Sequence, residues 1–448
     1  MFESQGFMRL IPLLLLVLCA SPAWAGTGKI AGTATDAETG APLAKVNISL
    51  GVANQGATTD DRGRFIMLNV PPGSHTLTAT HVGYRTLSLE AVRVSAGLTT
   101  DLELALSSSA IAVEAVVVRA KRALIDKNAT NAVRIVAGED LQLLPFRGVQ
   151  NVVALQPGVV EDEGALHVRG SRADEIGFYV DGASVRNAVT GNASVGLIDE
   201  ALAEIQLQAG GFNAEYGGAN AGILLQELRT GAPEWRIGLL LESDNFTSDH
   251  EKRLGAYSYG YGNQVLTLSG PVAGNRKIRA FAAVQRRVQD SAPVFWDGFS
   301  STDLVDSGSR GGSVHWASPD APDSVDLVLG AGNIEHTGSE RLDFNGSLHF
   351  DYFPFQLRLT GLYTGEDREL NPAPVRNMLN LARLPESERS ASLLNLKGVH
   401  FLDANTFYEL NLSFYSQEQQ IFDPLFKDDF MLYNDSLAVA QAGADFAS

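Results

Sequence analysis

The feature that most constrains this chain is a strict alternation of apolar and polar residues in its second half. Between Leu342 and Tyr352 the even positions are Leu, Phe, Gly, Leu, Phe and Tyr, whereas the odd positions are Asp, Asn, Ser, His and Asp. Segments 355–364 and 408–414 repeat the pattern. Because successive side chains of a strand point to opposite faces, each segment predicts a strand with one apolar and one wet, polar face.

Alternating segments of about ten residues with aromatic residues near their ends are typical of transmembrane barrel strands. A soluble sandwich alternates in the same way, so the alternation alone leaves both folds open. Connection lengths favour the barrel, because short turns at 271–277 and 353–354 alternate with long loops at 246–262 and 366–391. Consecutive barrel strands run in opposite directions, so short turns lie at one end of the barrel and long loops at the other. The turn at 353–354 falls at the short-turn end only if one more strand is inserted near 312–317, and we therefore expect a strand there.

The chain is short for a complete barrel around a plug. Plugged outer-membrane transporters use about 22 strands, and at roughly 10 residues each their strands alone need about 220 residues. The part of this 448-residue chain after residue 232 is shorter than that and contains long loops. Since an open barrel would expose unpaired backbone to lipid, we expect 233–448 to be a partial barrel and the chain to be a truncated copy or a fragment of a longer protein.

The N-terminus predicts export. An apolar run at 11–20 follows Arg9, is too short to span a bilayer, and is followed by Ala-Trp-Ala at 23–25, a small-residue cleavage site. We therefore expect 1–25 to be a signal peptide. The one cysteine of the chain lies inside it, so the mature chain would have no disulfide and no thiol chemistry.

Composition and motifs exclude several classes of function. A net charge of -18 speaks against nucleic-acid binding, which needs clustered Lys and Arg. The sequence has no Gly-x-Ser-x-Gly, no phosphate-binding Gly-Lys-Ser/Thr loop and no zinc-spaced His or Cys set. We expect no enzyme, and accordingly no catalytic residues, no metal and no cofactor.

Residues 28–106 predict a small all-β module, because short alternating runs are separated by Gly, Pro and Asp turns. Its characteristic elements are Asp36, Thr39-Gly40-x-Pro42-Leu43, Thr59-Asp60-x-x-Gly63-x-Phe65, Pro72-Gly73 and Gly83-Tyr84. These elements resemble the carboxypeptidase-regulatory-like family, which implies an Ig-like β-sandwich over 26–107. We expect it to be a structural or partner-facing module.

Residues 108–122 predict a linker that ends in a β-branched run, Val116-Val117-Val118, and a basic end. Two interpretations remain open. The run is either an edge strand of the next domain or an extended peptide that adds itself to the sheet edge of another protein.

Residues 123–232 predict a mixed α/β segment, with short helices after Asp140 and near 149–155 and strands near 166–168 and 177–180. Six short elements follow in order: Val168-Arg169-Gly170, Tyr179-Val180-Asp181-Gly182, Ile205-x-Leu207, Ala214-Glu215-Tyr216-Gly217, Ala221-Gly222 and Thr230-Gly231. Their order resembles the plug domain of TonB-dependent outer-membrane receptors. With the β-sandwich ahead of it, the arrangement is similar to the SusC-like and Oar-like branches.

The resemblance implies a mainly β chain made of an Ig-like sandwich, an α/β plug and part of an antiparallel barrel in the bacterial outer membrane. It implies TonB-energised uptake of a scarce solute, such as a siderophore, a glycan or a peptide. The implied partners are TonB with ExbB and ExbD, outer-membrane lipid, the solute and a surface lipoprotein. The alternative is an Oar-like adhesion or export-linked protein without import activity.

The resemblance also implies site residues. The candidate TonB box, the segment that TonB grips, is Glu114, Ala115, Val116, Val117 and Val118. The plug motif residues are Arg169, Gly170, Asp181, Gly182, Tyr216 and Gly217. We expect the Arg169 guanidinium to bind a carboxylate of the barrel wall, Asp181-Gly182 to form a tight turn, and Gly217 to allow close approach to the wall.

Overall fold

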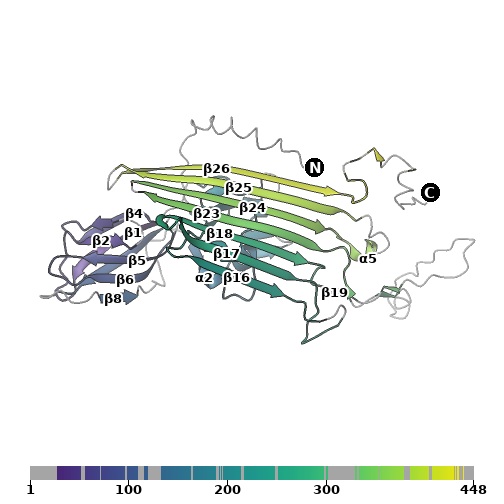
Figure 1. The fold of residues 1–448 in the computed structure, drawn as a ribbon, viewed down its shortest axis with the longest axis horizontal. Helices are drawn as coiled ribbons and strands as arrows, with labels where there is room; N and C mark the ends of the chain where they lie inside the picture. The colour runs from purple at the N-terminus through teal and green to yellow at the C-terminus, as the bar shows by residue number, and fades with distance from the viewer. Residues whose placement is uncertain are drawn as a thin grey trace, which may run out of the picture.

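The structure consists of three successive parts that are built mainly from strands (Figure 1). The computed structural model describes residues 28–51, 56–70, 72–95, 98–108, 116–119, 133–162, 165–187, 191, 193, 195–212, 216–247, 251–296, 299–300, 328–329, 332–352, 354–377, 384–402, 406–427, 429, 431–432 and 437. The expected signal peptide, Glu114, Ala115 and the expected strand at 312–317 lie outside these residues. Across the described segments, no helix combines the length and the apolar character needed to cross a membrane.

The first part is a two-sheet sandwich, as the sequence predicts. Its strands are β1 (Gly28–Asp36), β2 (Asn47–Leu50), β3 (Gly56–Thr58), β4 (Arg64–Val70), β5 (Gly73–Thr80), β6 (Leu87–Val94), β7 (Thr99–Leu106) and β8 (Val116–Arg119). One sheet has the order β4-β1-β7 and the other β3-β2-β5-β6-β8. Fully buried aliphatic side chains, among them Ile30, Ile48 and Leu77, fill the space between the two sheets.

Strand β8 ends the five-stranded sheet of the sandwich. It pairs with β6 in parallel, from Leu87 opposite Val116 to Glu90 opposite Arg119. The β-branched run of the linker is therefore an edge strand of the domain that precedes it. The interpretation of this run as an edge strand of the next domain is therefore wrong, because its backbone pairs with β6 of the sandwich.

The second part is the expected α/β plug. Its elements are β9 (Val133–Ala137), α2 (Gly138–Leu141), α3 (Val149–Ala154), β10 (Val159–Asp162), β11 (Ala165–Val168), η2 (Ala173–Glu175), β12 (Ile176–Val180), β13 (Ala183–Ser184), η3 (Asp199–Ala201), β14 (Leu202–Gln208) and β15 (Gly222–Leu228). The main sheet has the order β13-β12-β15-β14-β9, with β12 and β15 parallel. Every residue of β12 and β15 is buried, which makes these two strands the centre of the plug.

The third part is a large antiparallel sheet, which we call the wall. Its strands, in spatial and chain order, are β16 (Arg236–Ser243), β17 (Gly262–Val272), β18 (Asn275–Gln289), β23 (Ser339–Tyr352), β24 (Phe355–Glu369), β25 (Glu386–Phe401) and β26 (Phe407–Phe422). Short elements lie in the long connections: β19 (Phe295–Trp296), β20 (Phe299–Ser300), β21 (Val328–Leu329), β22 (Gly332–Asn333) and α5 (Pro374–Asn377). Within the described residues β16 and β26 are the open edges of this sheet.

The expected alternation of short turns and long loops is confirmed, but the additional strand is not. Strand β18 pairs directly with β23, from Ile278 opposite Phe350 to Gln289 opposite Ser339. In the wall sheet no strand therefore lies between β18 and β23, and residues 312–317 themselves lie outside the described residues. The long connection joins two neighbouring antiparallel strands, so the direction of every strand is already consistent.

The two faces of the wall differ as the alternation predicts. Large apolar side chains such as Leu239, Leu266, Phe344 and Leu394 are exposed on the outward face. Polar residues fill the inward face, but they are not wet. The plug lies against this face, behind the wall in Figure 1, and one apolar core joins both parts, including Phe281 of the wall.

The outward face yields a test of lipid contact. We expect Leu394→Arg to lower the free energy of unfolding in lipid vesicles by about 2–4 kcal/mol, because this position lies near the middle of β25 and would place the charge near the bilayer midplane. Glu388→Arg, on the same face near the end of the strand, should cost about 0–1 kcal/mol. Chemical denaturation in vesicles measures both, and equal losses would contradict a lipid-facing surface.

Candidate functional site

The contact between plug and wall is formed by buried polar groups. The inward-facing side chains involved are Asn263, Gln285, Asp343, Asn345, Ser347, His349, Thr360, Thr364 and Asn395, all of them at most 6% exposed. A polar group without water costs free energy unless it finds a hydrogen-bond partner. Plug groups supply many of these partners, and they gather in two clusters.

The Asp181 cluster consists of Asp181, Glu227, Arg358, Thr360 and Asn395. Asp181 and Gly182 have φ values of 47° and 84°, so the Asp-Gly pair forms the tight turn expected after β12. The turn points the carboxylate at the wall. Its Oδ2 accepts a hydrogen bond of 2.5 Å from Thr360 Oγ1 and lies 2.9 Å from Arg358 Nη2.

The backbone strengthens the same contact. Asp181 Oδ1 accepts from the backbone N of Leu228 at 3.0 Å, and Asn395 Nδ2 donates to the backbone O of Asp181 at 3.1 Å. Arg358 Nη2 also donates to the backbone O of Leu228 at 2.7 Å. One turn of the plug is therefore held by three neighbouring positions of β24 and β25.

Glu227 adds a second carboxylate to this cluster, so acidic groups outnumber basic ones. Its Oε2 lies 3.8 Å from Arg358 Nη1, so one guanidinium faces two carboxylates. Burial, and next the negative charge of Asp181, raise the pKa of Glu227 well above its usual range. The arrangement therefore stabilises the protonated form of Glu227 relative to its charged form.

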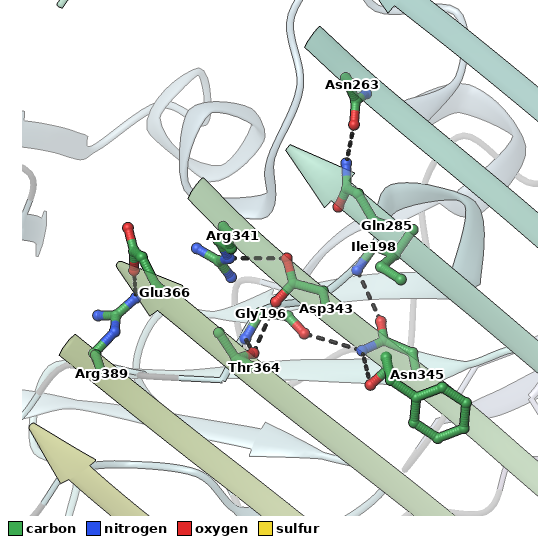
Figure 2. A network of polar contacts seen from close by, with 11 residues as sticks. Gly196, Ile198, Asn263, Gln285, Arg341, Asp343, Asn345, Thr364, Glu366 and Arg389 are labelled. Carbon is green, nitrogen blue, oxygen red and sulfur yellow. Dashed lines mark hydrogen bonds and ion pairs between the residues drawn. The ribbon is translucent and has the colours of Figure 1, made fainter. Parts of the chain in front are cut away.

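The Gly196 cluster is the second contact, and Figure 2 shows it. The backbone N of Gly196 donates to Thr364 Oγ1 at 2.7 Å, and Asn345 Nδ2 donates to the backbone O of Gly196 at 3.0 Å. The backbone N of Ile198 donates to Asn345 Oδ1 at 2.8 Å. Two wall side chains thus take the place of a β-strand partner for this plug loop.

Only glycine fits at this position of the loop. A Cβ on Gly196 would lie 1.9 Å from Arg341 Nη2 and from Asp343 Oδ1. Asp343 is itself held by Thr364 Oγ1 at 2.8 Å and by Arg341 Nε at 2.8 Å. The close approach of plug backbone to wall occurs here.

A third contact connects the sandwich to the plug. Ser95 Oγ donates to Glu204 Oε2 of β14 at 2.8 Å, and Arg93 Nε lies 3.7 Å from the same oxygen. Arg93 Nη1 also pairs with Glu139 Oε1 at 3.3 Å. Because Glu204 is only 1% exposed, the sandwich covers a buried charge at the end of the plug sheet.

Arg169 does not make the predicted contact. Its φ of 54° places it in a turn with Gly170, its backbone N donates to Gly158 O at 2.7 Å, and its side chain is exposed. In the described part of the chain it forms no ion pair with a wall carboxylate. The expected pairing occurs with the charges reversed, since the guanidinium belongs to wall residue Arg358 and the carboxylate to plug residue Asp181.

The Tyr216-Gly217 prediction is wrong in part. Tyr216 is buried and packs edge to face on Tyr179, with ring centroids 5.1 Å apart, and Tyr179 Oη donates to Gly217 O at 2.8 Å. A Cβ on Gly217 would meet nothing within 4 Å. The contacts with Tyr179 tie this element to β12, so it stabilises the plug internally.

Sequence reasoning missed Glu227, Arg358 and Gly196. Two signals were present. Glu227 stands with Gln226 inside the otherwise apolar run 222–228, and Arg358 is the one charged residue of the alternating segment 355–364. The Gly196 contact had no local signal, because the atoms that forbid a side chain there belong to β23, about 145 residues further along the chain.

Metal binding has no support at these contacts. Within the described residues no group of three or more His, Cys, Asp and Glu side chains is arranged to hold a metal ion.

Comparison with known families and proteins agrees with the two inferred resemblances. The family described as carboxypeptidase regulatory-like domain matches residues 29–107, and the TonB-dependent receptor plug domain matches residues 126–223. The TonB-dependent transporter Oar of Myxococcus xanthus is 24% identical over 233 residues, which cover 49% of this chain and 22% of Oar. The chain thus spans about a fifth of the length of this curated relative.

Solved outer-membrane proteins are similar at lower identity. The transporter YddB from Escherichia coli is 13% identical with a TM-score of 0.42, over 65% of this chain and 39% of YddB. The alcaligin receptor FauA from Bordetella pertussis is 11% identical with a TM-score of 0.43, over 66% and 40% of the two chains. The ferric yersiniabactin uptake receptor FyuA from Yersinia pestis is 14% identical with a TM-score of 0.43, over 66% and 42%.

The Asp181 cluster can be tested by removing one charge. We expect Asp181→Asn to weaken the contact by about 1–3 kcal/mol, less than the ~3–5 kcal/mol typical of a broken buried pair, because Glu227 still faces Arg358. The measurement is amide hydrogen exchange at Leu228, whose N–H binds Asp181. Asp174→Asn, at a partly exposed plug carboxylate, is the matched control and should leave that exchange unchanged; equal protection in both variants would contradict the assigned role.

The raised pKa of Glu227 predicts a pH dependence. The folded chain holds a proton on this group that the unfolded chain releases above about pH 4.5, the ordinary value for Glu. Stability must therefore fall as pH rises from about 4.5 toward the folded pKa. We expect Glu227→Gln to flatten this fall, as measured by denaturant unfolding across a pH series. Asp199 and Glu200, whose pKa values burial also raises, leave a residual slope of the same sign; a steeper fall in the variant would contradict this assignment.

Proposed function

We propose that this chain, which carries the carboxypeptidase-regulatory-like domain and the plug domain of TonB-dependent receptors, acts in a bacterial outer-membrane receptor that imports a scarce solute. The observation that carries the proposal is the plug itself, held against the polar face of the wall by the Asp181 and Gly196 clusters. The exposed apolar face on the other side of the wall suits lipid.

The clusters suit a plug that must be held and then released. Each contact is a hydrogen bond or ion pair whose partners can be hydrated once water enters, so one cluster can open without the other. Strand β9 is the open edge of the plug sheet, pairs only with β14 within the described residues, and is mostly half-buried. Force applied ahead of β9 would therefore reach the least stable part of the plug first.

The segment ahead of β9 contains the candidate TonB box, 114–118. Its described residues belong to β8, which pairs with β6 on one side and, among the described strands, has no partner on the other. An open strand edge can accept a strand from a partner protein through backbone hydrogen bonds. TonB, energised through ExbB and ExbD, is the partner we propose for this edge.

The nature of the solute is proposed only as a class. Siderophores, glycans and peptides are the candidates, and a surface lipoprotein is a candidate partner for their capture. The described parts of the long connections, 244–247, 251–261, 290–296, 332–338, 370–377 and 384–385, lie at the wall end opposite the short turns (Figure 1) and belong to the proposed capture loops. Export through the signal peptide and assembly in the outer membrane complete the proposal.

The location of the sandwich favours import over surface adhesion. Its contacts with the plug, at Arg93 and Ser95, place it at the wall end that carries the short turns (Figure 1). Short turns face the periplasm in outer-membrane barrels. A sandwich on that side is suited to periplasmic partners, whereas an adhesin would present it at the cell surface.

The TonB-box assignment is tested at one position. We expect Val117→Pro to reduce capture of the TonB periplasmic domain and proton-gradient-dependent uptake at least about tenfold, because proline removes a backbone donor needed for strand pairing. Val117→Thr keeps both the donor and the β-branched shape and should behave like the unmodified chain. Normal capture and uptake with Val117→Pro, at normal surface expression, would exclude this segment as the TonB box.

A further inference from the structure

Four basic side chains form a row across the inward face of the wall. Arg279 of β18 stands opposite His349 of β23, which stands opposite Arg358 of β24, which stands opposite Lys397 of β25. Directly opposed residues of neighbouring antiparallel strands lie within about 5.5 Å of each other, so like charges there are unfavourable unless they are compensated.

Only half of this row is compensated by acidic groups. Arg358 faces Asp181 and Glu227, as described above, and Lys397 Nζ lies 3.3 Å from Glu409 Oε1. In the described part of the chain, Arg279 and His349 have no carboxylate within ion-pair distance. Arg279 Nε and His349 Nδ1 are buried and have no hydrogen-bond partner. The whole His349 side chain is only 6% exposed, so water does not replace the missing partner.

The backbone of residues 229–231, at the end of the plug, crosses the row. Its carbonyl oxygens accept single hydrogen bonds from wall side chains. Arg229 O accepts from Ser347 Oγ at 2.6 Å, and Gly231 O accepts a long 3.5 Å hydrogen bond from Arg279 Nη1. One neutral carbonyl does not balance a guanidinium. The same crossing places the Arg229 side chain beside the uncompensated half of the row.

The side chains of Arg229, Arg279 and His349 face an open cavity of about 760 Å³ at the junction of sandwich, plug and wall. The other charged groups of its lining are largely paired: Arg93 with Glu139, and Arg147 with Glu200 at 3.2 Å and with Glu242 at 2.9 Å. The Arg229 side chain, by contrast, donates from Nε to Leu202 O at 3.1 Å and has no ion pair in the described residues.

The cavity therefore combines the half-buried guanidiniums of Arg229 and Arg279, neither of which has an ion pair in the described residues, with the partnerless Nδ1 of His349. Its volume lies in the range of small-molecule sites, roughly 300–1,000 Å³. Burial also lowers the pKa of Arg229, and the more distant charges of Glu200 and Glu139 oppose this shift only in part. Guanidiniums bind carboxylate and phosphate groups through paired, charge-assisted hydrogen bonds.

We propose that this cavity binds a small oxyanion, a carboxylate or phosphate group, through Arg229, Arg279 and His349. Binding of the anion does not depend on the proposed function. Its further role, as a station that an anionic solute occupies between plug and wall near the periplasmic end, rests on the proposed function.

The test is anion binding by the full chain in detergent, with inorganic phosphate and citrate as probes. Isothermal titration at constant ionic strength, set with sodium chloride, should show saturable binding of at least one probe. Arg279→Gln should weaken that binding at least about tenfold. Arg286→Gln is the matched control, because Arg286 lies on the same strand but on the outward face, paired with Glu340 at 2.7 Å, and should bind like the unmodified chain.

A purely structural role for Arg279 predicts a different effect of Arg279→Gln on the melting temperature and on anion affinity. If Arg279 only positioned the backbone at Gly231, its loss would lower the melting temperature in anion-free buffer and would not change anion affinity. We expect instead that Arg279→Gln melts no lower than the unmodified chain without anion and loses the rise in melting temperature that phosphate or citrate causes. His349→Gln provides the same comparison with both guanidiniums retained.

Two outcomes overturn the proposal: no saturable binding of either probe by the unmodified chain, or equal binding by the unmodified chain and both variants. Uptake is not part of the readout. A failure of transport would therefore count against the proposed function and leave the anion site standing, whereas a failure of binding would remove the site alone.

Discussion

The dry contact between the plug and the polar face of the wall is the constraint on which the rest of the structure depends. A strand that alternates apolar and polar residues exposes its apolar side to lipid only if its polar side is satisfied elsewhere. Here the plug satisfies it, with Asp181, the Gly196 loop and the carbonyl groups of 228–231 as partners. The wall sheet and the plug thus complete one another.

The chemistry of that contact sets its mechanical character. An apolar core also joins plug and wall, but the polar clusters beside it can exchange protein partners for water one at a time. The pair of carboxylates on Arg358 adds a proton-dependent element, because burial and the charge of Asp181 keep the pKa of Glu227 high. In the other half of the basic row the imbalance is opposite, because within the described residues no carboxylate lies within ion-pair distance of Arg279 or His349.

The site could be predicted in part. The Asp181-Gly182 turn followed from the sequence because an Asp-Gly pair between apolar runs favours positive φ at both residues. The wall partner did not follow: Arg169 was expected to bind the wall, yet it lies in an exposed turn, and Arg358 has that role. Likewise Gly217 was expected at the close approach that Gly196 makes, since a glycine alone does not reveal which backbone it must admit.

The sequence by itself determined the local geometry and the order of the parts. Period-two alternation, turn glycines and connection lengths act over a few residues, so they specified the wall strands and which face of each is apolar. The sandwich and the plug were expected from the resemblance of short motifs to two known families. Only the tertiary structure decided which groups meet across the plug and the wall, because partners such as Asp181 and Thr360 are 179 positions apart. It also decided that β8 joins the sandwich and that β18 joins β23, since pairing depends on which strand edge is free when the parts come together.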